Sequence, residues 1–204
     1  KFRHWNDKHP FGVIMQTIGD VNILPNFYEY QLYCKSLYAS IQDFTKKTMR
    51  KLKTKSENEF IQEILNKYNL LDRRKEEIYT IDPTLSKDFD DGLSLIEKED
   101  SYLFSIYISN VSFWMDALDL WGSFSQRITT IYLPDRKRPM LPTVLSDALC
   151  SLQEKRMRFA FTLDIAVDKE KYKIKDVSFK NCCKYSSLKT NILLFSSFKR
   201  VSYS

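Results

Sequence analysis

Two segments in the second half of the chain alternate strictly between apolar residues and other residues. The apolar positions are Tyr102, Phe104, Ile106 and Ile108 in the first segment and Phe159, Phe161, Leu163, Ile165 and Val167 in the second. A period of two is typical of a half-buried strand. We therefore predict two sheet strands whose apolar faces form a core, with Arg158, Thr162 and Asp164 on the opposite face.

The segment from residue 41 to about residue 68 has a different pattern. It contains neither glycine nor proline, and Phe60, Ile61, Ile64 and Leu65 recur at helical spacing. We predict helices here and two further short helices over residues 116–125 and 143–149. Helices combined with a largely antiparallel sheet indicate an α+β fold.

The beginning of the chain carries turn residues between short apolar bursts. Pro10, Gly12 and Gly19 separate these bursts, which favours short strands joined by turns. We predict three regions: a small β module over residues 1–38, a helical basic connector over residues 39–75, and a mixed domain over residues 76–204.

Charge and cysteine content narrow the functional classes. Among 204 residues, 32 Lys and Arg exceed 26 Asp and Glu, and this surplus suits a polyanionic partner. The four cysteines show no paired spacing, and no secretory leader or apolar run of about 18 residues is evident. We expect an intracellular protein of the cytoplasm or nucleus that does not bind membranes. The lysine-rich run of residues 46–55 is either a solvated face or a nucleic-acid contact.

Four aspartates crowd residues 82–91: Asp82, Asp88, Asp90 and Asp91. Like charges so close destabilise one another unless a cation lies among them. In an extended segment Asp88 and Asp90 share one side, and a bend at Pro83 returns Asp82 toward them. Such hard oxygen ligands suit Mg²⁺, with Mn²⁺ as the alternative, and a natural use is phosphodiester chemistry.

These aspartates and the rest of the chain allow few other interpretations. An acidic surface turn remains open, whereas a calcium loop fails because Leu93 or Lys87 occupies the position that needs glycine. His4 and His9 are the only histidines, so a catalytic triad lacks a nearby base. Four glycines in total form no phosphate-binding loop.

A basic, proline-rich loop follows at residues 131–142. Tyr132 offers a flat ring for base stacking, and Arg136, Lys137 and Arg138 offer cations for phosphates. This combination is typical of sequence-independent binding to a single strand. A stiff surface loop with solvated cations is the alternative.

Several motifs in a fixed order resemble the ribonuclease II (RNB) family of processive 3′-to-5′ exoribonucleases, which includes the catalytic subunit of the exosome. They are TIDPTLSKDFDD at residues 80–91, YLPD from Tyr132, PMLP at 139–142 and LSDALCSL at 145–152. Residues 9–14 and 18–20 are similar to the cold-shock-type OB module that precedes the catalytic domain in this family.

The resemblance implies roles for individual residues. Asp82, Asp88 and Asp91 would be ligands of Mg²⁺, and Asp90 would be the aspartate whose loss the chemistry tolerates least. Tyr132 and Arg127 would hold single-stranded RNA, and nucleoside 5′-monophosphates would be released. An exosome-type complex is left open as a protein partner.

The chain also departs from the family pattern. Asn110 stands where the family has aspartate, and Ile128 stands where it has glycine. After Phe179 the sequence no longer follows the family, whose second half of the active site comes later. We therefore expect a piece of a longer or truncated protein with little turnover of its own, and an inactive RNA-binding relative is the alternative.

Overall fold

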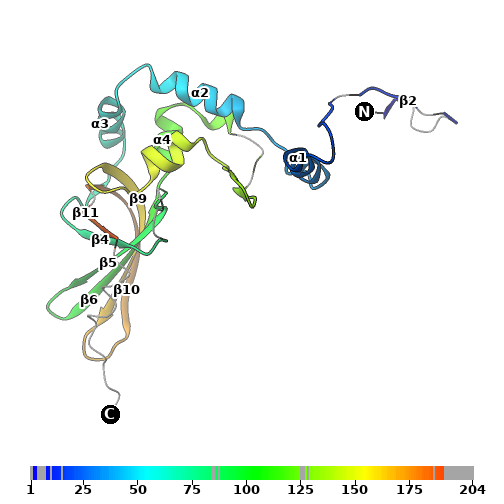
Figure 1. Ribbon diagram of the computed structural model, residues 1–204. Coiled ribbons are helices and arrows are strands. Elements are labelled where there is room, and N and C mark those ends of the chain that lie inside the picture. The colour runs from blue at the N-terminus through cyan, green and yellow to red at the C-terminus, as the bar shows by residue number, and fades with distance from the viewer. Residues whose placement is uncertain are drawn as a thin grey trace, which may run out of the picture. The chain divides into compact units, whose positions relative to one another are not determined.

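The computed structural model describes residues 2–3, 8–9, 11–14, 16–83, 86, 88–124, 127, 129–185 and 187–190 (Figure 1). The chain divides into two compact units. One contains residues 1–40 with 125–128, and the other contains residues 41–124 with 129–204. No helix in the described ranges is both long enough and apolar enough to span a bilayer.

The first unit holds one helix and two very short strands. Strands β1 (Phe2–Arg3) and β2 (Phe11–Gly12) pair antiparallel, and helix α1 spans Leu24–Cys34. The expectation of strands and turns alone missed α1. Pro25 lies in its first turn, where the absent N–H costs nothing and the fixed φ favours a helix start. The OB-like assignment of residues 1–38 stays a prediction.

Helices α2 (Gln42–Leu52) and α3 (Glu57–Lys67) confirm the helical prediction for residues 41–68. A reciprocal capping box fixes the start of α3, because the Ser56 hydroxyl accepts from the Glu59 N–H and the Glu59 carboxylate accepts from the Ser56 N–H. The predicted helix over residues 116–125 was misplaced. Helix α4 spans Ser112–Ala117, and only a 3₁₀ turn, η1 (Trp121–Ser123), follows it.

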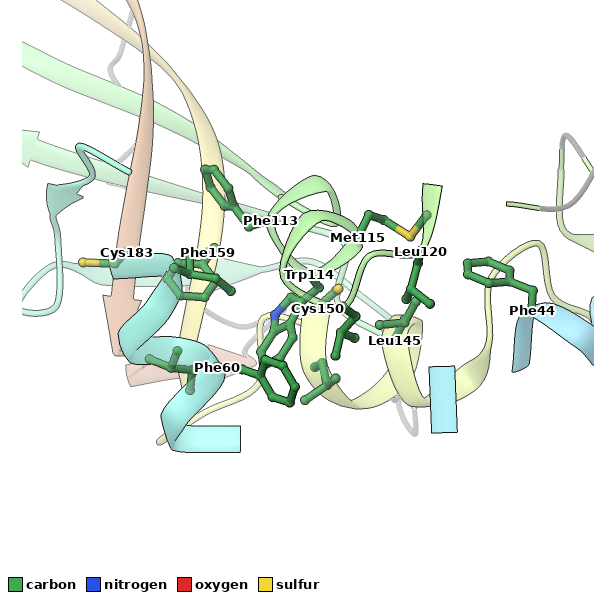
Figure 2. Close-up of a cluster of buried hydrophobic side chains, with 14 residues drawn as sticks. Phe44, Phe60, Phe113, Trp114, Met115, Leu120, Leu145, Cys150, Phe159 and Cys183 are labelled. Atoms are coloured by element: carbon green, nitrogen blue, oxygen red, sulfur yellow. The ribbon is translucent and has the colours of Figure 1, made fainter. Parts of the chain in front are cut away.

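The main apolar core lies between these helices and one face of the seven-stranded sheet described below. That face is called the outer face. Trp114 of α4 lies at its centre with Phe60 of α3 and with Leu145 of the π-helix η2 (Val144–Cys150), as Figure 2 shows. The Phe113 ring meets the ring of Phe159 edge to face, with centroids 5.7 Å apart. This core holds the helices against the sheet.

Seven strands form the sheet of the second unit, in the order β11-β4-β5-β6-β9-β10-β3. Neighbours from β4 to β10 pair antiparallel, whereas β3 and β11 pair parallel with β10 and β4, which confirms a largely antiparallel sheet. The bounds are β3 Leu71–Asp72, β4 Glu77–Thr80, β5 Asp91–Glu97, β6 Ser101–Ser109, β9 Met157–Asp168, β10 Ile174–Tyr185 and β11 Ser187–Thr190.

The two edges of this sheet meet. Strand β3 leads directly into β4 and β10 directly into β11, so residues 71–80 run parallel to residues 182–190. The register places Leu71 beside Cys182 and Glu77 beside Ser187. The sheet is therefore closed on itself and has an inner and an outer face.

The predicted core face of β6 and β9 was largely wrong. The inner-face residues Arg158, Thr162 and Asp164 are buried, whereas Phe161 on the outer face is 42% exposed. Alternation reveals that a strand has two faces, but it does not reveal which face closure will bury. Phe159 is the exception, because α4 covers that part of the outer face.

A network of polar side chains lies inside the closed sheet, and one buried cation lies beside it without a hydrogen bond to the described residues. Arg73 donates to Ser105 at 3.2 Å, to the Tyr107 hydroxyl at 3.0 Å and to Asp164. Lys184 is fully buried beside them, with its ammonium group 5.6 Å from the centroid of the Tyr107 ring and no hydrogen bond to any described residue. Burial lowers the pKa of Lys184 to about 7.

Substitution of Lys184 by Met should change how stability depends on pH. From pH 7 to 10 the unfolded chain holds the lysine proton and the folded chain does not, so Lys184 makes the free energy of unfolding rise with pH, by at most about 1.4 kcal/mol per pH unit. Burial raises the pKa of Cys150 and of Cys182 to about 12, so these two thiols act in the opposite direction above about pH 9 in all three proteins. Between about pH 7 and about pH 9.5, urea unfolding should therefore give a more positive change in the free energy of unfolding for the wild type and the exposed control Lys173→Met than for Lys184→Met. An equal change in all three would contradict the buried, neutral lysine.

Candidate active site

The acidic loop, residues 81–90, joins β4 to β5 and is anchored at Phe89. The Phe89 N–H donates to the Ser151 hydroxyl at 3.0 Å, and its carbonyl accepts from the Leu152 N–H at 2.8 Å. Its ring packs against a second buried cluster that includes Ile78 and Tyr107. Phe89 therefore fixes the backbone from which the carboxylates of Asp88 and Asp90 project.

Two further contacts hold this arrangement. The Asp90 carbonyl accepts from the N–H of Ser109, the last residue of β6, at 2.8 Å. On the other side, the buried guanidinium of Arg158 donates to the Ser151 carbonyl at 2.9 Å and to the Ala148 carbonyl at 2.6 Å. Polar side chains of the inner face thus position the segment that anchors Phe89.

Asp90 lies at the electrostatic centre of the loop. Although the residue is exposed, partial desolvation raises its pKa, and the charges of Asp88, Asp91, Asp147 and Asp82 raise it further. The other three aspartates singled out by sequence thus lie close enough to Asp90 to repel its charge. A bound cation would relieve this repulsion.

Asp147 was not among the predicted site residues. It lies on η2, accepts a hydrogen bond from Ser146 at 2.5 Å, and raises the pKa of Asp90. The sequence showed it inside the motif at residues 145–152, but only the packing of η2 beside the loop brings it to the cluster.

Lys137 is the cation that the chain itself supplies to the cluster. Its ammonium group lies 2.9 Å from the carboxylate of Asp88 and 3.7 Å from that of Asp147. The hydrogen bond to Asp88 raises the pKa of Lys137. Sequence analysis assigned this lysine to RNA phosphates, whereas the structure pairs it with two acids.

The carboxylate oxygens of this cluster meet some of the requirements of a site for a hard divalent ion. The Asp82 atom Oδ2 is buried and forms no hydrogen bond to any described residue, as expected of an oxygen that faces a cation. Within the described part of the chain, however, no three acidic, histidine or cysteine side chains converge to hold an ion by themselves. Water or substrate oxygens would have to complete the coordination, as Mg²⁺ commonly requires.

Tyr132 lies in a small hairpin beside the cluster. Strand β7 (Ile131–Tyr132) pairs antiparallel with β8 (Lys137–Arg138), and the register places Tyr132 opposite Lys137. The Tyr132 side chain is 76% exposed, so its ring is available for stacking. Arg136 is exposed in the turn between the strands, and Arg138 is half-buried.

Arg127, Asn110 and Ile128 are not among the residues that the structure places at the acidic cluster. Arg127 is buried in the first unit, where it donates to the Ala39 carbonyl, and burial lowers its pKa. Its role in RNA binding stays a prediction. The Asn110 amide oxygen accepts from the Ser112 N–H at 3.1 Å at the start of α4. Ile128 lies outside the described residues.

Comparison with known proteins settles the family. The model of the RNB domain matches residues 71–188, more than half of the chain. The chain belongs to the RNB family. Ribonuclease R of Mycoplasmopsis pulmonis is 30% identical over 172 residues, which cover 76% of this chain and 23% of the relative. This RNB-family chain therefore spans about a quarter of that protein.

Solved structures share the fold. RNase R of Mycoplasma genitalium, in complex with double-stranded RNA, aligns with a TM-score of 0.65 and 22% identity, over 84% of this chain and 30% of its own. The yeast pseudonuclease Ssd1 aligns with a TM-score of 0.66 and 15% identity, over 99% of this chain and 25% of its own. At these identities the likeness establishes the RNB fold alone.

Gly92 allows β5 to approach β4 directly after the acidic loop. A Cβ atom at this position would lie 2.7 Å from a methyl group of the buried Ile78 and 3.3 Å from the Tyr79 carbonyl. Gly92→Ala should therefore lower the free energy of unfolding by about 1–3 kcal/mol. Gly122→Ala is the matched control, because its Cβ would meet no atom within 4 Å. Urea denaturation measures both, and equal stability of the two variants would contradict the close approach.

Proposed function

We propose that this RNB-family protein is a metal-dependent 3′-to-5′ hydrolytic exoribonuclease that acts on single-stranded RNA. The observation that carries the proposal is the set of carboxylates around Asp90, fixed through Phe89 and placed beside the exposed ring of Tyr132. Because the chain spans only 23% of its ribonuclease R relative, the activity is proposed for the whole protein.

Three aspartates of the acidic loop and Asp91 at the start of β5 are proposed as the metal-binding residues. Asp82, Asp88, Asp90 and Asp91 would hold Mg²⁺, with Mn²⁺ as the alternative. When bound, such an ion polarises a phosphoryl oxygen and lowers the pKa of a water molecule. Lys137 offsets part of the repulsion in the cluster and would have to release Asp88 for that carboxylate to become a ligand.

The hairpin is proposed to hold the end of the RNA. The Tyr132 ring would stack on a base near the 3′ end, and Arg136 and Arg138 would bind phosphates. Arg127 is proposed as a further RNA contact. The RNA complex of the Mycoplasma genitalium RNase R supports an RNA ligand. A complex of the exosome type is left open as a protein partner.

Replacement of Asp90 tests the metal site. In calorimetric titrations of the chain with Mg²⁺ or Mn²⁺, Asp90→Asn should weaken binding at least about tenfold, because a charge at the centre of the cluster is lost. The control Asp100→Asn removes a carboxylate that is paired with Lys175 on a distant turn and should leave metal binding unchanged.

The same pair of variants tests the chemistry in the whole protein. There, Asp90→Asn should slow removal of 3′ nucleotides from labelled RNA by about 10²-fold or more, whereas Asp100→Asn should not. Full cleavage by Asp90→Asn would contradict the proposed nuclease. RNA binding without metal binding or cleavage in the wild type would instead favour an inactive RNA-binding relative.

Tyr132→Ala tests the stacking role. Loss of one base stack should weaken binding of a single-stranded oligonucleotide by about 1–3 kcal/mol, or roughly 5- to 150-fold. Tyr172→Ala is the matched control, since Tyr172 is also 76% exposed but lies on the turn between β9 and β10. Fluorescence anisotropy measures both affinities, and equal losses in the two variants would argue against stacking on Tyr132.

A further inference from the structure

Helix α2 has one buried face and one strongly charged face. Phe44 and Thr48 are buried, and Leu52 packs against the main core. At 100° per residue these three side chains lie on one side of the helix, and Lys46, Arg50 and Lys53 lie on the opposite side. These three residues, all exposed, are called the α2 cationic face.

Most of the surplus charge of the protein is located at this helix. Residues 42–55 contain six cations, Lys46, Lys47, Arg50, Lys51, Lys53 and Lys55, against the single anion Asp43. This segment therefore supplies a net charge of +5 out of +6 for the chain. Such a density of cations in a short segment attracts a polyanion.

The charges of the α2 cationic face are poorly compensated by the protein. Lys51 pairs with Asp119 and Lys55 with Glu63, but Arg50 and Lys53 form no ion pair with any described residue. Lys46 reaches Asp43 only at 3.9 Å. Cations at spacings of three and four residues repel one another on a helix, so an external anion would stabilise them.

We propose that the α2 cationic face binds the phosphate backbone of RNA, upstream of a 3′ end held at the acidic loop. This inference deepens the proposed function and rests on it for the position of the 3′ end. From Lys46 to Lys53 the helix rises about 10 Å, which matches about three phosphates of a stacked strand at a spacing of about 3.4 Å. Helix α2 and the acidic loop belong to the same compact unit.

The buried face of α2 favours RNA over a membrane surface. A basic amphipathic helix binds anionic lipid most strongly when its apolar face enters the bilayer, and charge alone contributes only modestly for each Lys or Arg near the surface. Here Phe44 and Leu52 belong to the main core, so that face is already occupied. The α2 cationic face is therefore suited to a partner that is recognised by charge, such as the phosphate backbone of RNA.

The test compares two triple variants of the chain. Lys46→Gln/Arg50→Gln/Lys53→Gln neutralises the α2 cationic face, and Lys98→Gln/Lys171→Gln/Lys173→Gln removes the same charge from exposed lysines on the far turns of the sheet. Binding of a fluorescent single-stranded RNA of about 20 nucleotides is measured by anisotropy in EDTA at several salt concentrations. Circular dichroism checks that both variants remain folded.

Compared with the wild type, the α2 variant should bind the RNA at least about tenfold more weakly. The slope of its log K against log salt concentration should be shallower by about 2, because each lost phosphate contact changes the slope by about 0.7. The control variant should keep the slope of the wild type. An oligonucleotide of about four nucleotides should be bound equally by all three proteins. The proposal would be overturned if the two triple variants had equal slopes. It would also be overturned if the α2 variant lost binding to phosphatidylserine vesicles while its RNA affinity stayed unchanged.

This outcome is separable from the proposed function. Binding in EDTA depends on no metal and no cleavage, so the salt slope can change even if Asp90→Asn shows that the acidic loop is not a nuclease site. Conversely, equal slopes would contradict the proposed RNA contact at α2 without affecting the proposed roles of Asp90 and Tyr132.

Discussion

Closure of the sheet is the constraint on which the rest of the structure depends. Residues 71–80 can lie beside residues 182–190 only if β4, β5, β6, β9 and β10 curve around a common interior. That interior contains a polar network beside a small apolar cluster, and Arg73 bridges β6 and β9 through Tyr107 and Asp164. A buried guanidinium without these acceptors would cost several kcal/mol, so the network specifies the register of the strands.

The acidic loop derives its position from this closure. It leaves β4 and enters β5 at one end of the closed sheet, where Phe89 is held by residues 151 and 152 and Asp90 by the end of β6. The fold thus supports a concentration of negative charge that a free loop would disperse. Lys137 compensates this charge only in part, which leaves the cluster suited to an additional cation.

The positions of helices and strands could be predicted from the sequence better than the face that each of them buries. Helical spacing around Phe60 and alternation around Phe159 identified α3 and β9, and the density of aspartates identified the loop. The face of β9 predicted to be buried was wrong, because the inner face is buried only when the sheet closes, and Asp164 pairs there with Arg73, which is distant in sequence. Asp147 and the pairing of Lys137 were missed for the same reason. Neither contact leaves a local pattern, since both arise from the packing of η2 and the β7–β8 hairpin.

A crystal structure of the chain grown with Mn²⁺ tests the central claim most directly. We expect an anomalous difference peak about 2.1 Å from carboxylate oxygens of the acidic loop, with the Lys137 ammonium group withdrawn from Asp88. A structure that shows Lys137 still bound to Asp88 and no peak near Asp82, Asp88, Asp90 or Asp91 at saturating Mn²⁺ would contradict it.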